Sequence, residues 1–171
     1  GENGKLGVYP NSGNGTFGTP SNYTITGNLA GVAVGDFRGT GQREMVIMTS
    51  PEPSGNSRLT WLSTQLTANP LTENYRFDLP MRYEHIVSAD VNSDGRPDLA
   101  LLSKGRRVVT YVSGDSPQNA TGRLSHYAVG RAPTAIAFGN VDFDATSPLD
   151  LVLSDKATLL GGASTSAWIL Q

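Results

Sequence analysis

A loop pattern followed by an apolar run occurs three times along the chain. The loops begin at Asp36, Asp90 and Asn140, so their starts are separated by 54 and 50 residues. The apolar runs that follow are Met45–Met48, Leu99–Leu102 and Leu151–Leu153. A repeat near fifty residues with about four short strand signals in each unit is typical of β-propeller blades. The repeat therefore predicts an all-β fold of four-stranded antiparallel blades.

The composition favours the same class. Only 16% of the 171 residues are charged, and the chain has 20 glycines and 10 prolines. This balance indicates many short strands joined by tight turns, and no stretch keeps a helical 3.6-residue apolar stripe over three turns.

Strand signals divide the chain into four segments. Residues 1–27 carry two signals, as in the outer half of a blade, and residues 28–80, 81–130 and 131–171 form one unit each. The expected strands are Leu6–Tyr9 and Asn22–Ile25, then Gly31–Gly35, Met45–Thr49, Leu59–Ser63 and Tyr75–Leu79, then His85–Ala89, Leu99–Ser103, Val108–Val112 and Leu124–Val129, then Ala135–Gly139, Leu151–Ser154, Ala157–Leu160 and Ala167–Leu170. The first two strands of each unit are almost wholly apolar, which predicts that both faces are covered by neighbouring sheets.

The segments sum to about three and a half blades, whereas closed propellers have about four to eight. We therefore expect a partial propeller, either a slice of a larger ring or a chain that associates with other copies of itself through its open faces and strand edges.

The middle loop, residues 90–98, carries an oxygen-bearing side chain at every second position and then a glycine, Gly95. Ca²⁺ takes six to eight oxygen ligands from a tight loop of this kind. The expected ligands are the side chains of Asp90, Asn92, Asp94 and Asp98 and the main-chain carbonyl of Arg96. An EF-hand is excluded because its twelfth position, which requires Glu, is Leu101 inside a strand signal.

The other two loops depart from this pattern. The first has Arg38 and Thr40 at the third and fifth positions, so we expect no ion there and expect Arg38 to bridge Asp36 and Glu44. The third keeps the alternation but lacks the glycine, and its last carboxylate comes two residues late. Its candidate ligands are Asn140, Asp142, Asp144 and Asp150.

Several functional classes find no support. The net charge of −2 without a basic stripe argues against nucleic-acid binding. The sequence also contains no run of 18 apolar residues, the length that a membrane-spanning helix needs. The two histidines, His85 and His126, are not framed by a nucleophile motif, so we expect no enzymatic activity. The chain has no cysteine, which excludes disulfides.

Asn14, Asn22 and Asn119 lie in Asn-x-Ser/Thr sequences and are glycosylation candidates in a secreted protein. The aromatic residues offer either packing between sheets or a sugar-stacking surface, and packing is the expected role for most of them. They are Tyr9, Tyr23, Trp61, Tyr75, Tyr111 and Trp168.

The repeated segments resemble the FG-GAP or VCBS-type repeats of integrin-α-like β-propellers. The resemblance is carried by Gly-Asn-Gly-Thr-Phe at 13–17, Val-Gly-Asp-Phe at 34–37 and the loop at 90–98. It implies four-stranded blades, Ca²⁺ held between the first and second strands, and an extracellular or cell-surface location. The function expected from it is a calcium-binding module for binding, adhesion or structural assembly, whose partners include glycans or extracellular proteins. The alternatives are a carbohydrate-binding lectin and an accessory propeller of an extracellular polysaccharide-active enzyme.

Overall fold

A computed structural model describes residues 3–50, 55–63, 73–114, 124–130, 132–141, 149–159 and 162–170. Every regular element in these ranges is a β-strand, and every strand pairing is antiparallel. The expected all-β class and the antiparallel four-stranded sheets are thereby confirmed. Within the same ranges there is no helix long and apolar enough to cross a membrane.

The chain begins with a two-stranded sheet, formed by β1 (Asn3–Val8) and β2 (Ser21–Thr26). Two four-stranded sheets follow, each with its strands in sequence order. The first contains β3 (Leu29–Gly35), β4 (Glu44–Thr49), β5 (Arg58–Ser63) and β6 (Glu73–Asp78). The second contains β7 (His85–Ala89), β8 (Asp98–Ser103), β9 (Val108–Val112) and β10 (Leu124–Ala128). The ten expected strands of this region are all present, with small shifts at their ends.

The C-terminal sheet differs from the expectation. It has three described strands, β11 (Pro133–Gly139), β12 (Asp150–Leu159) and β13 (Gly162–Leu170). The expected separation of 151–154 from 157–160 is wrong, because β12 continues through both segments. No glycine or proline lies between Ser154 and Ala157 to start a turn, and β12 stays paired with β13 across this stretch.

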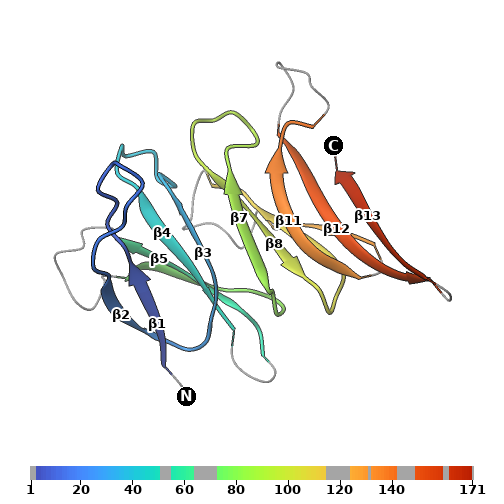
Figure 1. Cartoon of the computed structure of the whole chain (residues 1–171), viewed down its shortest axis with the longest axis horizontal. Coiled ribbons are helices and arrows are strands. Elements are labelled where there is room, and N and C mark those ends of the chain that lie inside the picture. Colours follow the sequence, from blue (N-terminus) through green and yellow to red (C-terminus); the bar gives the residue numbers. More distant parts are fainter. Residues whose placement is uncertain are drawn as a thin grey trace.

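The sheets lie in chain order, with the two-stranded sheet at one end and the C-terminal sheet at the other (Figure 1). The first strands β3, β7 and β11 are spatial neighbours in that order. Over the described residues the sheets do not close into a ring. What is established is a row of antiparallel sheets, while their identity as propeller blades remains a proposal.

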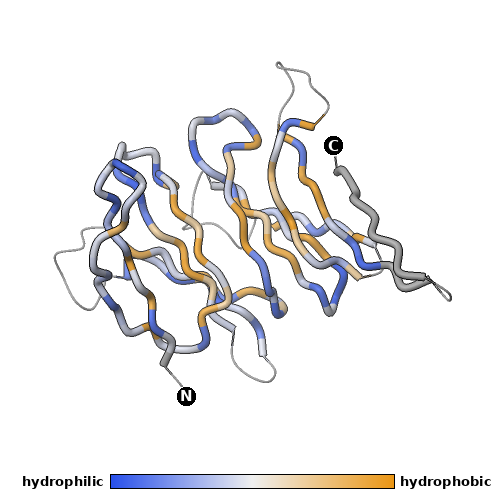
Figure 2. Tube along the Cα trace, viewed as in Figure 1, coloured by the Kyte–Doolittle hydropathy of each residue, from blue (hydrophilic) through white to orange (hydrophobic). Residues whose placement is uncertain are grey.

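The core consists of three apolar clusters, each between two neighbouring sheets. Strand β4 is buried along its whole length, and its alternate residues enter different clusters: Met45 and Ile47 face the two-stranded sheet, whereas Val46 and Met48 face the second four-stranded sheet. Strand β8 divides its side chains in the same way. The apolar colouring of these strands is visible in Figure 2. Coverage of both faces is therefore confirmed for β4 and β8.

The same expectation is wrong for β3. Its residues Val32 and Val34 are 39% and 52% exposed, although they belong to one of the apolar first strands. They share a face with Ile47 and Met45, with which they are paired across the sheet. The physical reason is that, among the described strands, β1 and β2 alone lie on this face, and they pack on β4, on Leu62 and on Leu29 at the start of β3, which leaves Val32 and Val34 uncovered.

Candidate calcium loop and its two counterparts

The three loops of the repeat occupy equivalent places in the fold. Each joins the first strand of a sheet to the second, and each is flanked by an acidic residue that opens the second strand. The flanking pairs are Gly35 with Glu44, Ala89 with Asp98, and Gly139 with Asp150. The side chains of all three acids are buried, with residue exposures of 1%, 0% and 4%. The two extra residues of the third loop therefore do not change its register, and Asp150 holds the place of Asp98.

The middle loop is curled by hydrogen bonds from its own main chain. The Asp90 carboxylate accepts the N–H groups of Asp94 at 3.1 Å and of Gly95 at 2.9 Å. Asn92 Oδ1 accepts the Asp94 N–H at 3.0 Å, and Asp94 Oδ1 accepts the Arg96 N–H at 2.8 Å. Four of the expected ligand positions are thus on one tightly turned segment.

Two residues of this loop take left-handed backbone conformations. Ser93 has a φ of 59° and Gly95 a φ of 82°. A glycine adopts such angles without a Cβ penalty, which explains why the turn carries a glycine at its sixth position.

Asp98 closes the loop from the first residue of β8. Its Oδ2 accepts the Val91 N–H at 3.2 Å and its Oδ1 accepts the Gly114 N–H at 2.7 Å. Burial raises the pKa of Asp98, against the N–H groups of Gly114 and Val91, which lower it. Tyr111 also donates a side-chain hydrogen bond to Asp98, and burial followed by the charge of Asp98 raises the pKa of Tyr111 to about 12. A bound cation would supply the positive charge that this buried carboxylate lacks.

The first loop has the same backbone architecture as the middle loop. The Asp36 carboxylate accepts the Thr40 N–H at 2.9 Å and the Gly41 N–H at 2.6 Å, which are the same relative positions that Asp90 uses. Gly39 and Gly41 have φ of 64° and 78°, matching the fourth and sixth positions of the middle loop. The Thr40 N–H is the main cause that lowers the pKa of Asp36, and Gly41, Gly39 and the charge of Arg96 add to it against the effect of burial.

Arg38 takes the place of Asn92 in this first loop and contacts the buried acid. Its Nε lies 2.5 Å from Glu44 Oε1, and the Glu44 side chain is only 2% exposed. The expected ion pair with Glu44 is present. The expected bridge to Asp36 is wrong: among the described residues, the Asp36 carboxylate is held by backbone N–H groups instead.

Arg96, the one basic residue of the middle loop, extends toward the first loop. A Cβ placed on Gly39 would lie 2.8 Å from the Arg96 Nε, and the charge of Arg96 lowers the pKa of Asp36. The guanidinium of Arg96 therefore lies against the neighbouring loop, whereas its main-chain carbonyl remains part of the middle loop.

The third loop shares one feature of the middle loop that the structure describes. The Val141 N–H donates to Asp150 Oδ2 at 2.9 Å, as the Val91 N–H donates to Asp98. Asn140 precedes it in the place of Asp90, whereas Asp142 and Asp144 lie outside the described residues.

The donors of the middle loop fit Ca²⁺ in chemistry, since all are carboxylate, amide or carbonyl oxygens. Among the described residues, however, no three acidic, histidine or cysteine side chains converge as a metal-binding group. The carboxylates of Asp90 and Asp94 instead accept backbone N–H groups. Calcium binding by residues 90–98 therefore needs the loop side chains to move toward a common centre.

Sequence reasoning missed three groups that hold Asp98: the Tyr111 side chain and the main-chain N–H groups of Val91 and Gly114. Tyr111 and Gly114 belong to the segment around β9, which the sheet brings beside β8. No local sequence pattern signals such a contact.

The glycosylation candidates lie in different surroundings. Asn14 is exposed in the loop between β1 and β2, where its Oδ1 accepts hydrogen bonds from the N–H and hydroxyl of Thr16. Asn22 is exposed on β2, and Asn119 lies outside the described residues. Among the aromatics, Trp61 and Tyr23 are buried, so packing is confirmed for these two, whereas Tyr9 is 58% exposed. The side chain of Trp168 is not among those described.

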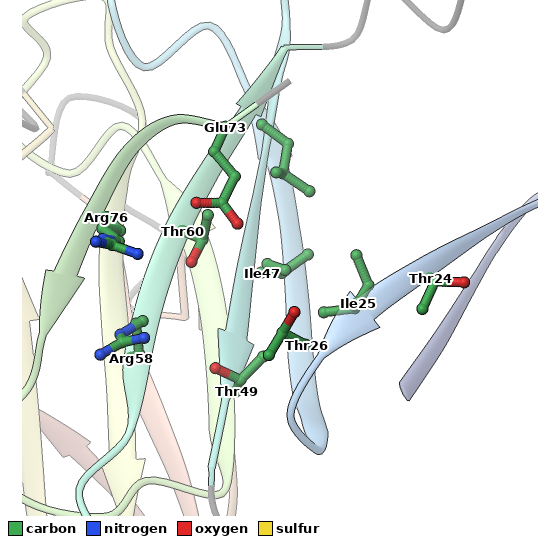
Figure 3. A pocket seen from close by; sticks show the side chains of 10 residues that line it. Thr24, Ile25, Thr26, Ile47, Thr49, Arg58, Thr60, Glu73 and Arg76 are labelled. Atoms are coloured by element: carbon green, nitrogen blue, oxygen red, sulfur yellow. The ribbon is translucent and has the colours of Figure 1, made fainter. Parts of the chain in front are cut away.

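A groove of about 420 Å³ lies between β2 and the face of the first four-stranded sheet. Figure 3 shows Ile25 of β2 directed toward Ile47 and Thr26 beside Thr49, whereas Thr24 lies on the far side of Ile25 from the sheet. Thr60, Arg58 and Arg76 line the groove from the four-stranded sheet, with Glu73 at one end. Ile25, Ile47 and Leu62 also line it. It offers hydroxyl, guanidinium and carboxylate groups to a polar ligand.

Comparisons of this chain with protein-family models, with curated proteins and with solved structures found no match.

Proposed function

We propose that this chain is an extracellular calcium-binding module of β-propeller type, built from FG-GAP or VCBS-like blades and serving binding, adhesion or structural assembly. The observation that carries the proposal is the shared architecture of the first and middle loops. Both loops are held by the same main-chain hydrogen bonds, and they differ in the groups that face the buried acid.

In the first loop the guanidinium of Arg38 forms an ion pair with the buried acid Glu44. The middle loop has Asn92 at that position and a carboxylate, Asp94, two residues later, and its one guanidinium, Arg96, lies against the first loop. A loop with this backbone and three carboxylates suits an external hard cation, and Ca²⁺ is the one that takes flexible sets of six to eight oxygens. We assign the ion a structural role, since protein oxygens would fill most of its shell.

Isothermal titration of Ca²⁺ into the whole chain tests this function. Wild-type protein should bind Ca²⁺, and Asp94→Ala should abolish most of the heat because it removes a ligand without touching the apolar clusters. Glu73→Ala, which removes an exposed carboxylate on β6, is the matched control and should titrate like wild type. Equal heats from wild type and Asp94→Ala would refute the assignment of the site.

A second candidate function is glycan binding, and the groove between β2 and the first four-stranded sheet favours it. Threonine hydroxyls with two arginines and a glutamate suit a hydroxylated or acidic sugar. A glycan array should then give signals that Arg76→Ala removes and that Arg106→Ala, a change in the 104–107 turn, leaves unchanged. Identical arrays for the two variants would exclude the groove as the sugar site.

A further inference from the structure

The three first strands carry equivalent residues in very different surroundings. Val32, Ile86 and Ile136 hold equivalent positions, because each lies three residues before the last residue of its strand. Their side chains face the preceding sheet. Ile86 and Ile136 are 9% and 8% exposed, whereas Val32 is 39% exposed. The difference does not come from the strand itself, since all three are β-branched apolar residues in matching registers.

The covering of Ile86 shows what is missing over Val32. Ile86 packs on the first strand of the preceding sheet, so closely that a Cβ on Gly31 would overlap its Cγ2. The preceding sheet of Val32 is the two-stranded one, whose β1 and β2 pack on Met45, Ile47 and Leu62. It has no counterpart of β3, and in the described part of the chain β1 pairs with β2 alone.

The other end of the row presents the complementary surface. Ala135 and Ala137 of β11 hold the places of Gly31 and Ala33, and both are exposed on the face that none of the other described sheets covers. The β3–β4 and β11–β12 pairings also share a register shift at the same place, between Leu29 and Gly31 in β3 and between Pro133 and Ala135 in β11. The face of β11 therefore has the small residues and the register that cover Ile86 inside the chain.

We propose that the strand pair β11–β12 of a second copy of this chain covers Val32 and Val34 and supplies the missing inner strands of the two-stranded sheet. This inference rests on the blade arrangement of the proposed function, but not on Ca²⁺. In the assembly, β1 of one copy takes the place along β12 of the other copy that β13 holds in the single chain. Strand exchange of this kind joins copies head to tail.

Two copies of this chain supply enough strands for a closed ring. The described residues form thirteen strands, which are the two outer strands β1 and β2, two complete four-stranded sheets, and β11, β12 and β13. With β13 displaced by β1 of the other copy, twelve strands remain, which make three blades. Closure within a single chain would give only three blades, below the four to eight of closed propellers, and the two ends lie far apart along the row (Figure 1). Two copies would close a ring of about six blades, inside that range.

Engineered cysteines test the contact directly, because the chain contains no cysteine of its own. By equivalence with Ile86 and Gly31, Val32 of one copy should lie against Ala135 of the other. Val32→Cys and Ala135→Cys proteins, prepared separately, mixed and oxidised, should give a disulfide-linked dimer. The control mixes Val32→Cys with Tyr127→Cys, which places the second thiol on an exposed residue of β10.

Sedimentation of the unmodified protein provides an independent readout. Wild type should dimerise with rising concentration, and Val32→Asp should weaken the dimer about tenfold or more because it places a carboxylate in an apolar contact. Tyr127→Asp should leave the dimer unchanged. A monomer at every concentration, or equal cross-linking in both cysteine mixtures, would overturn the proposal.

Two further outcomes separate this inference from the proposed function. Cross-linking within single chains that carry both Val32→Cys and Ala135→Cys would show that the chain's own β11 fills the site, and would exclude the second copy. A monomer that still binds Ca²⁺ would refute the assembly alone, whereas a dimer without Ca²⁺ binding would refute the calcium site alone.

Discussion

Converting the first loop into a copy of the middle loop should create a second calcium site. The change is Arg38→Asn combined with Thr40→Asp, which reproduces the side chains of the middle loop at its third and fifth positions. Asp36, Gly41 and Glu44 already hold the first, sixth and ninth positions. The backbone need not change, because Asp36 accepts the same pair of N–H groups that Asp90 accepts.

The expected loss of stability follows from removal of the ion pair between Arg38 and Glu44. Without Ca²⁺, Glu44 loses the partner 2.5 Å away while its side chain stays buried. Since Arg38 is 44% exposed, we expect a loss of about 1–3 kcal/mol rather than the larger cost of a fully buried pair. For a chain of this size each kcal/mol shifts Tm by about 2–4 °C. With a Kd of ~0.1 mM, ~1 mM Ca²⁺ restores about 1.4 kcal/mol.

Calorimetry in EGTA and in Ca²⁺ measures both the loss of stability and its recovery on Ca²⁺ binding. The double variant should unfold at a lower temperature than wild type in EGTA, recover part of the difference in Ca²⁺, and bind one more Ca²⁺ per chain than wild type. Arg38→Asn alone is the control, since it removes the ion pair but adds no carboxylate. An unchanged Ca²⁺ stoichiometry in the double variant would show that loop architecture does not define the site.

Three further predictions concern stability. Leu101→Ala should lower the free energy of unfolding by about 2–5 kcal/mol in denaturant titrations, because Leu101 is fully buried in the cluster between the two four-stranded sheets. Leu149→Ala, at a residue that is 38% exposed, should cost far less, and equal costs would contradict the core assignment. Tyr83→Phe removes the 2.6 Å hydrogen bond between the buried Tyr83 hydroxyl and Thr110, so we expect a loss of about 1 kcal/mol, and no loss would show that the bond is not stabilising. Burial, with the charge of Lys104 adding to it, lowers the pKa of His85 below 6.5. The unfolded chain therefore binds more protons than the folded chain just below pH 6.5, and the free energy of unfolding should fall there as pH drops. His85→Gln should flatten this dependence of the unfolding free energy on pH, and an unchanged dependence would assign it to other groups.

Local patterns were sufficient to predict most of the strands and the equivalence of the loops. The glycine and the alternating oxygens at 90–98 specify the turn through short-range hydrogen bonds and backbone angles, which are encoded within a few residues. The apolar runs at β4 and β8 likewise report burial on both faces. The ion pair between Arg38 and Glu44 was predictable because the two residues occupy ligand positions of the same loop.

Features that depend on distant segments could not be predicted in this way. Val32 has the same apolar character as Ile86, and only the extent of the neighbouring sheet makes one exposed and the other buried. The contacts of Asp98 with Tyr111 and Gly114 arise from the pairing of β8 with β9. The continuation of β12 past Ser154 depends on its pairing with β13, against a local sequence that suggested two shorter strands.

The calcium assignment is tested most directly by a crystal structure of the whole chain grown in millimolar Ca²⁺. An ion should lie in the middle loop, about 2.3–2.6 Å from side-chain oxygens of Asp90, Asn92, Asp94 and Asp98 and from the Arg96 carbonyl. We expect no ion in the first loop, where the Arg38 guanidinium should remain against Glu44. A middle loop without an ion, its carboxylates still bound to backbone N–H groups, would contradict calcium binding by this chain.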